Sequence, residues 1–211
     1  MKTINNNISI KIILILIFFI SCSSEEEVEE VILLDPVITN QVVNLAAPQT
    51  GGMGQPIGGE FSKFDFKTGM KTTSETDWDI AFRGTTIAVN GGAATGTADE
   101  PVRNGDAAVS IVSGLFADVT DANNLTFTQD ADGAFAIPTG SDNGWYNYNF
   151  QTNIVSPIPG KILVFRTHDG KYAKVEILSY YLDQDSSNSG GGRNYTFNFV
   201  YNPNQGETSF E

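Results

Sequence analysis

Apolar and polar residues alternate with a period of two along much of this 211-residue chain. Residues 195–201 read YTFNFVY, and residues 171–178 read KYAKVEIL. Because successive side chains of a β-strand point to opposite faces, both segments are predicted to be half-buried strands. Residues 162–165 read ILVF without alternation, which is typical of a central strand covered on both faces.

Clusters of Gly, Asn, Asp and Pro separate these segments from other strand candidates and supply turns. Thr167-His168-Asp169-Gly170 predicts a tight hairpin turn between two of the strands. The sequence therefore predicts an all-β domain, a sandwich or open barrel of about ten antiparallel strands. The further strand candidates are 41–46, 61–66, 78–82, 86–90, 107–112, 125–128 and 145–150.

The N-terminal segment has the pattern of a secretory signal. Lys2 and Lys11 precede the apolar run IILILIFFI at 12–20, which is shorter than the roughly 20 residues of a membrane-spanning helix. Cys22 is the only cysteine and follows a small residue, Ser21. This resembles a bacterial lipoprotein signal, with residues 1–21 removed and Cys22 acylated. The alternative is an ordinary signal peptide with an incidental cysteine.

An acidic run follows Cys22, with five glutamates between residues 25 and 30. Like charges repel one another and stay solvated, so residues 22–36 are expected to form a disordered tether before an all-β domain at 37–211. The run also resembles the export tag of Bacteroidetes surface lipoproteins. We therefore expect a lipid-anchored protein of the outer membrane, exposed at the cell surface.

The formal net charge is −13. Nucleic-acid binding requires a basic surface, so this composition argues against a nucleic-acid partner. It also argues against attachment to anionic membranes by charge, which leaves the lipid as the anchor. With one cysteine, no disulfide can form within the chain.

An ordered series of short motifs resembles the HmuY-like family of Bacteroidetes outer-membrane lipoproteins from about Gln41 to Tyr201. The resemblance implies a compact all-β fold. The best-known members are haemophores that capture haem and pass it to a TonB-dependent receptor. The motifs are DWDIAFR at 77–83, VNGG at 89–92, GW at 144–145, PIPGK at 157–161, VFRT at 164–167, DGKYAKV at 169–175 and YTF at 195–197.

The resemblance does not extend to the iron ligands. The family type holds haem iron between two histidines, one after an Asp-Gly turn and one five residues beyond the Gly-Trp pair. Here these positions are Ala134 and Phe150, and neither side chain can ligate iron. Some members use methionine, but neither Met53 nor Met70 lies near these positions.

Two candidate ligand-binding features remain. His168 is the only histidine, and histidine is a common haem ligand. The alternative for His168 is an exposed turn residue. Tyr146, Tyr148 and Phe150 would share one face of a strand beside Trp145, as a platform for a porphyrin, another planar ligand or a sugar. The alternative for these aromatic residues is cross-strand packing.

Two acidic loops are candidate calcium-binding sites, because Asp130/Asp132 and Asp183/Asp185 place carboxylates at alternate positions. Neither loop completes a twelve-residue calcium loop, and turn chemistry explains both. Asp79 is expected to be solvated, opposite a core face of Trp78, Ile80 and Phe82.

The sequence contains no nucleophile elbow, zinc spacing or phosphate loop, so we expect no enzyme activity.

The sequence favours a surface lipoprotein that binds haem or a related small ligand for a TonB-dependent uptake system. The first alternative is a glycan-binding or adhesion lipoprotein that uses the aromatic side chains as sugar platforms. The second is a structural accessory of a receptor complex that binds no small molecule.

Overall fold

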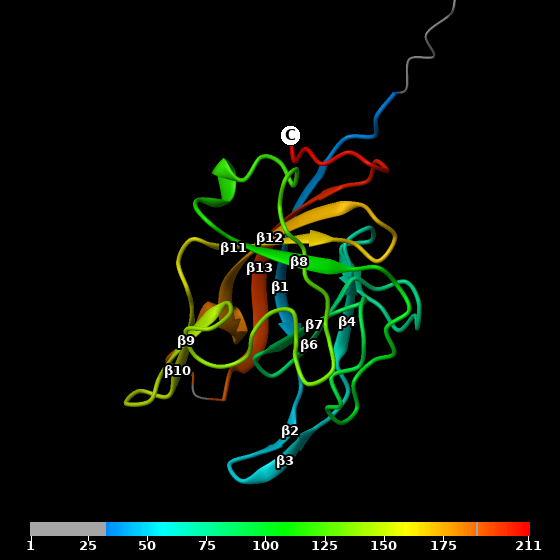
Figure 1. Ribbon diagram of the computed structural model, residues 1–211. Helices are drawn as coiled ribbons and strands as arrows, with labels where there is room; N and C mark the ends of the chain where they lie inside the picture. The colour runs from blue at the N-terminus through cyan, green and yellow to red at the C-terminus, as the bar shows by residue number, and fades with distance from the viewer. Residues whose placement is uncertain (1–32, 189) are drawn as a thin grey trace, which may run out of the picture. The chain divides into compact units, whose positions relative to one another are not determined.

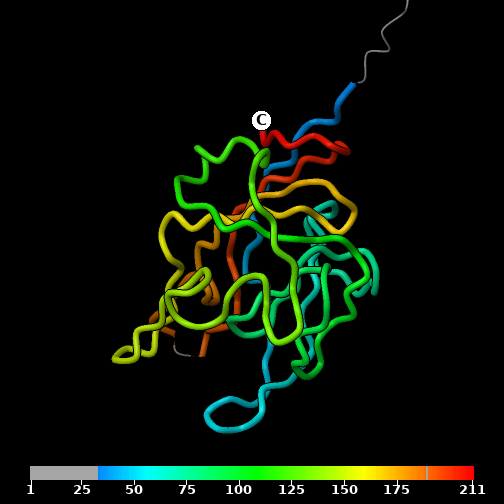
Figure 2. The backbone as a smooth tube through the Cα atoms, viewed as in Figure 1, coloured from blue at the N-terminus to red at the C-terminus, as the bar shows by residue number. Residues whose placement is uncertain are grey.

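A computed structural model describes residues 33–188 and 190–211. The chain forms two main antiparallel sheets (Figure 1). The five-stranded sheet has the order β1-β13-β12-β11-β8, and the four-stranded sheet has the order β5-β4-β6-β7. Two separate hairpins, β2-β3 and β9-β10, extend away from these sheets (Figures 1 and 2). The predicted all-β class is confirmed.

The described residues contain thirteen strands and two short 3-10 turns, η1 and η2, but no α-helix. No helix in this part of the chain is long and apolar enough to cross a membrane. The elements are β1 Ile38–Ala46, β2 Thr50–Gly52, β3 Gln55–Gly58, β4 Ser62–Asp65, β5 Met70–Lys71, β6 Ile80–Arg83, β7 Thr86–Val89, β8 Ala108–Ser113, η1 Phe116–Asp118, β9 Tyr146–Asn149, β10 Ile154–Pro157, β11 Lys161–Arg166, β12 Tyr172–Tyr181, η2 Leu182–Gln184 and β13 Gly192–Asn202.

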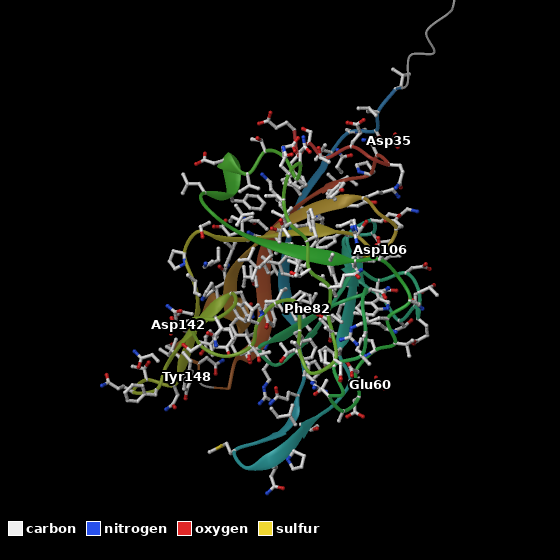
Figure 3. The ribbon with its side chains drawn as sticks, in the orientation of Figure 1. Asp35, Glu60, Phe82, Asp106, Asp142 and Tyr148 are labelled. Atoms are coloured by element: carbon white, nitrogen blue, oxygen red, sulfur yellow. The ribbon has the colours of Figure 1, made fainter. Side chains whose placement is uncertain are left out.

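The main core lies between the two large sheets and is rich in aromatic rings. The alternating face of β13 points into it: Phe197 meets Phe64 of β4 at 5.4 Å between ring centroids. Tyr195 meets Phe82 of β6 at 4.7 Å. Figure 3 shows Phe82 inside the fold. These contacts confirm the predicted face of 195–201 and make the domain a sandwich.

A smaller apolar cluster covers the opposite face of the five-stranded sheet. Ile162 and Val164 of β11 belong to it, whereas Leu163 and Phe165 belong to the main core. The central run at 162–165 is therefore covered on both faces, as predicted. Lys174 is buried beside this second cluster, where its amine donates to the carbonyls of Phe116 and Val119 at 2.8 Å each. Burial lowers the pKa of Lys174.

Two glycines make the turns of the core hairpins possible. Gly84 has a φ of 53° between β6 and β7, and a Cβ there would lie 2.0 Å from the Gln49 side chain. Gly170 has a φ of 85° in the predicted turn that joins β11 to β12. Positive φ costs glycine little, because it has no Cβ.

Some expectations about the strands were wrong. Residues 125–128 form no strand and make only an isolated bridge, between Thr128 and Val109. Trp78 is buried but belongs to a different cluster from Ile80 and Phe82, because β6 begins only at Ile80 and regular alternation does not reach residue 78. The predicted signal segment, Cys22 and most of the predicted tether lie outside the described residues.

Candidate functional site

The hairpin β9-β10 carries the aromatic residues singled out in the sequence. Its register pairs Tyr146 with Pro157 and Tyr148 with Val155. Trp145 fixes the base of the hairpin: it is buried and packs on Tyr195 with ring centroids 5.1 Å apart. Its indole N–H donates to the Thr85 carbonyl at 2.9 Å. The hairpin therefore extends from an anchored base.

Tyr146, Tyr148 and Phe150 do not form a single exposed platform. Tyr146 is buried, packs on Trp145 at 5.0 Å and accepts a hydrogen bond from Thr85. Tyr148 is 42% exposed and Phe150 is 79% exposed. Strand β9 ends at Asn149, so Phe150 lies in the turn, where strand alternation no longer sets its direction. The exposed aromatic surface consists of Tyr148 and Phe150.

Tyr148 is held in place on the hairpin (Figure 3). Its hydroxyl donates to the Asn153 side chain at 2.6 Å, and its backbone N–H donates to the Ser141 hydroxyl at 2.8 Å. Tyr148 and Phe150 line a recess of about 360 Å³ with Ser141 and Asp142. This surface offers an apolar ring beside polar groups.

Ala134, the other position that the family resemblance aligns with an iron ligand, lies in a different recess. This recess has a volume of about 590 Å³ and shares no lining residue with the recess of Phe150. A short turn holds Ala134, whose N–H and carbonyl both bond to Ala131. The structure does not bring the two family positions into one cavity.

His168 lies in the β11-β12 turn and pairs with the buried carboxylate of Asp79. Its Nδ1 lies 2.7 Å from Oδ1 of Asp79, which also accepts the His168 backbone N–H at 2.9 Å. The other Asp79 oxygen accepts the N–H of Phe66 at 2.8 Å. The expectation that Asp79 is solvated was wrong: Asp79 is buried and joins two turns. The imidazole itself is 19% exposed, so His168 is not a freely exposed turn residue.

The Asp79 hydrogen bond raises the pKa of His168, although burial opposes the shift. A raised pKa means that the pair stabilises the fold fully below the ordinary histidine value of about 6.5 and loses this contribution as pH rises through the folded pKa. Because His168 is the only histidine, proton NMR of untagged protein reports its titration without assignment. We expect a pKa above 6.5; a value at or below 6.5 would contradict the pairing.

The residues present do not fit the iron ligation of the family type. Among the described residues, no group of three or more His, Cys, Asp or Glu side chains could hold a metal. Met53 and Met70 are exposed on the β2-β3 turn and on β5, and neither lines the recesses of Ala134 or Phe150.

Asp130 of the suspected calcium loop is buried and accepts hydrogen bonds from Arg103, Val89 and Ala136, so protein donors occupy its carboxylate.

These features define an all-β domain with two exposed aromatic side chains on the hairpin β9-β10. A profile of the HmuY protein family matches residues 59–199, more than half of the chain. The chain therefore belongs to the HmuY family, which includes haem-binding proteins. This is a family of binding proteins rather than enzymes.

The solved structures that this chain matches have low sequence identity to it. An apo HmuY analogue from Tannerella forsythia has a TM-score of 0.48 and 13% identity, covering 81% of this chain and 99% of that one. A putative HmuY-like haem-binding protein from Bacteroides vulgatus has a TM-score of 0.45 and 16% identity, covering 80% and 93%. A putative lipoprotein from Bacteroides fragilis has a TM-score of 0.45 and 15% identity, covering 80% and 92%. A search of curated proteins found no match.

Proposed function

We propose that this protein is a surface lipoprotein that binds haem or a related small ligand for a TonB-dependent uptake system. Membership of the HmuY family is the observation that carries the proposal. The exposed rings of Tyr148 and Phe150 support it, because aromatic side chains on a hairpin with an anchored base offer an apolar surface to a planar ligand. Since Ala134 and Phe150 cannot ligate iron, contact with the ring system takes the place of the family's axial ligands.

The lipid anchor at Cys22 is part of the same proposal. An apolar run followed by a small residue, a cysteine and an acidic stretch supports it. Acylation would hold the domain at the outer membrane, near a receptor that accepts the ligand. Metabolic palmitate labelling that leaves the protein unlabelled would contradict the anchor, and a neighbouring TonB-dependent receptor gene would support the partner.

Hemin titration tests the binding function. We expect hemin to change its absorption spectrum on binding, and Phe150→Ala to weaken the affinity at least about tenfold, because a buried phenyl ring contributes roughly 1.5–3 kcal/mol. Met53→Ala is the matched control, because it also removes an exposed apolar side chain but lies outside the hairpin β9-β10. Its affinity should equal that of the wild type. A hemin spectrum that stays unaltered in both iron oxidation states would remove haem from the proposal.

Glycan binding is the competing function, since Tyr148 lies among the exposed amides of Asn147, Asn149 and Asn153. Aromatic rings beside amide groups also suit sugars, which present apolar faces and hydroxyls. A glycan array with hits that Tyr148→Ala abolishes, together with no hemin binding, would favour this alternative.

A further inference from the structure

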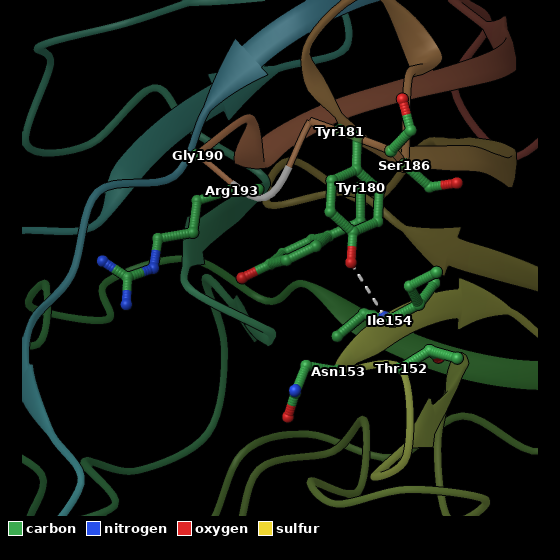
Figure 4. Close-up of a pocket in the computed structure, with 11 residues that line it drawn as sticks. Thr152, Asn153, Ile154, Tyr180, Tyr181, Ser186, Gly190 and Arg193 are labelled. Carbon is green, nitrogen blue, oxygen red and sulfur yellow. Dashed lines mark hydrogen bonds between the residues drawn. The ribbon is translucent and has the colours of Figure 1, made fainter.

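A further recess in the described part of the chain lies beside the hairpin β9-β10. It has a volume of about 650 Å³, within the range of roughly 300–1,000 Å³ that is usual for small-molecule sites. Residues 152–155 of the hairpin form one side, and the end of β12 with the start of β13 forms the other (Figure 4). It shares no lining residue with the recesses of Ala134 and Phe150. It is therefore a separate cavity.

One part of the cavity wall is apolar and well fixed. The rings of Tyr180 and Tyr181 pack edge to face, with centroids 5.6 Å apart, and both side chains are largely buried. The Tyr181 hydroxyl accepts the backbone N–H of Val155 at 2.9 Å, which ties β10 to β12 across the cavity (Figure 4). Ile154 and Val155 complete this wall. A ligand entering here meets an apolar surface that is already in place.

Two hydrogen-bond donors lie at the other part of the wall. Figure 4 shows the Tyr180 hydroxyl turned toward the side chain of Arg193. Burial raises the pKa of Tyr180 to about 12, so the hydroxyl remains a protonated donor at neutral pH. The Arg193 guanidinium is a cation and donates one N–H to the Gln49 carbonyl at 2.8 Å. Its other N–H groups can serve a ligand.

The charge around the cavity is unusual for so acidic a protein. Among the described residues that line it, Arg193 is the only charged one, and none is a carboxylate. Within residues 33–188 and 190–211, Arg193 forms no salt bridge. The nearby Asp185 accepts hydrogen bonds from Ser187. Arg193 also has a φ of 69°, a strained conformation that concentrates at functional sites.

We propose that this cavity binds a small amphipathic anion. Its carboxylate, sulfonate or phosphate group meets Arg193 and the Tyr180 hydroxyl, and its apolar ring packs against Tyr181, Ile154 and Val155. Charge-assisted hydrogen bonds from an arginine are roughly twice as strong as neutral ones, so the anion gives the site its selectivity. The site is additional to the hairpin surface proposed above for the planar ligand.

Two fluorescent probes test this proposal. The anion 8-anilinonaphthalene-1-sulfonate carries a sulfonate on its rings, and N-phenyl-1-naphthylamine has the same rings without it. We expect Arg193→Gln to weaken sulfonate-probe binding about tenfold and to leave the neutral probe within about twofold. Tyr180→Phe removes only the hydroxyl and should weaken the sulfonate probe by about threefold.

Arg166→Gln is the matched control, because it removes the same charge from another strand, where Arg166 pairs with Asp106. It should bind both probes like the wild type. The proposal is overturned if the wild type does not bind the sulfonate probe or if Arg193→Gln binds it unchanged. An equal loss of both probes in Arg193→Gln would also overturn it, as would sulfonate binding lost only in Phe150→Ala.

Discussion

Replacing Asp130 by alanine is expected to lower the free energy of unfolding by about 3–5 kcal/mol, because it breaks a buried ion pair and leaves Arg103 paired with Glu100 but not with Asp130. The Asp130 side chain is fully buried, and one of its oxygens accepts from Arg103 at 2.8 and 3.0 Å. The same carboxylate accepts the N–H groups of Val89 and Ala136. Arg103 is itself 2% exposed, so water cannot replace the lost charge. Urea unfolding measures the effect.

Asp132 provides the control for this change. It lies two residues along the same acidic loop but is exposed, and Asp132→Ala should change the free energy of unfolding by less than about 0.5 kcal/mol. Equal effects of the two substitutions would contradict the structural role of Asp130. A melting temperature that rises on addition of calcium in the wild type and not in Asp130→Ala would restore the calcium interpretation of this loop.

Trp145→Ala is expected to lower the free energy of unfolding by about 3–5 kcal/mol, as is usual for large aromatic residues removed from a core. Trp145 packs on Tyr146, Tyr180 and Tyr195, with ring centroids 5.0–6.0 Å apart. Its indole also bonds to the carbonyl of Thr85. Because these contacts join the base of β9 to the core, the substitution should also loosen the hairpin and weaken ligand binding.

Tyr148→Ala separates the loss of stability from the loss of ligand binding that Trp145→Ala is expected to cause. Tyr148 projects from the same hairpin but is 42% exposed, so its removal should cost less than about 1 kcal/mol of stability while weakening hemin binding. Urea unfolding and hemin titration of both variants give the comparison. A Trp145→Ala protein as stable as Tyr148→Ala would show that Trp145 does not anchor the hairpin.

The alternation of residues 195–201 and the apolar run at 162–165 were sufficient to predict the all-β fold and the faces of its longest strands. Other features depend on partners far away in the sequence. Asp79 is buried because His168, 89 residues later, closes over it, and periodicity carries no information about such a contact. The hairpin β2-β3 was missed because its strands are short and rich in glycine.

The candidate site was predicted only in outline. The sequence identified the aromatic segment at 145–150 but not that Tyr146 would pack inward and Phe150 lie beyond the strand. The cavity beside Arg193 was missed, because residues 183–193 are mostly polar or glycine and show no alternating pattern. Asn153, Asp183 and Arg193 have positive φ values there, and such strain in residues other than glycine cannot be predicted from the sequence pattern.

The central claim is that this HmuY-family protein binds a planar ligand by contact, without the family's iron ligands. The most direct test is parallel titration with hemin and iron-free protoporphyrin IX. We expect affinities within about threefold of each other, since a tenfold difference would require about 1.4 kcal/mol from the iron. Hemin binding that is a hundredfold tighter than protoporphyrin binding would contradict the claim and show that the protein ligates the metal.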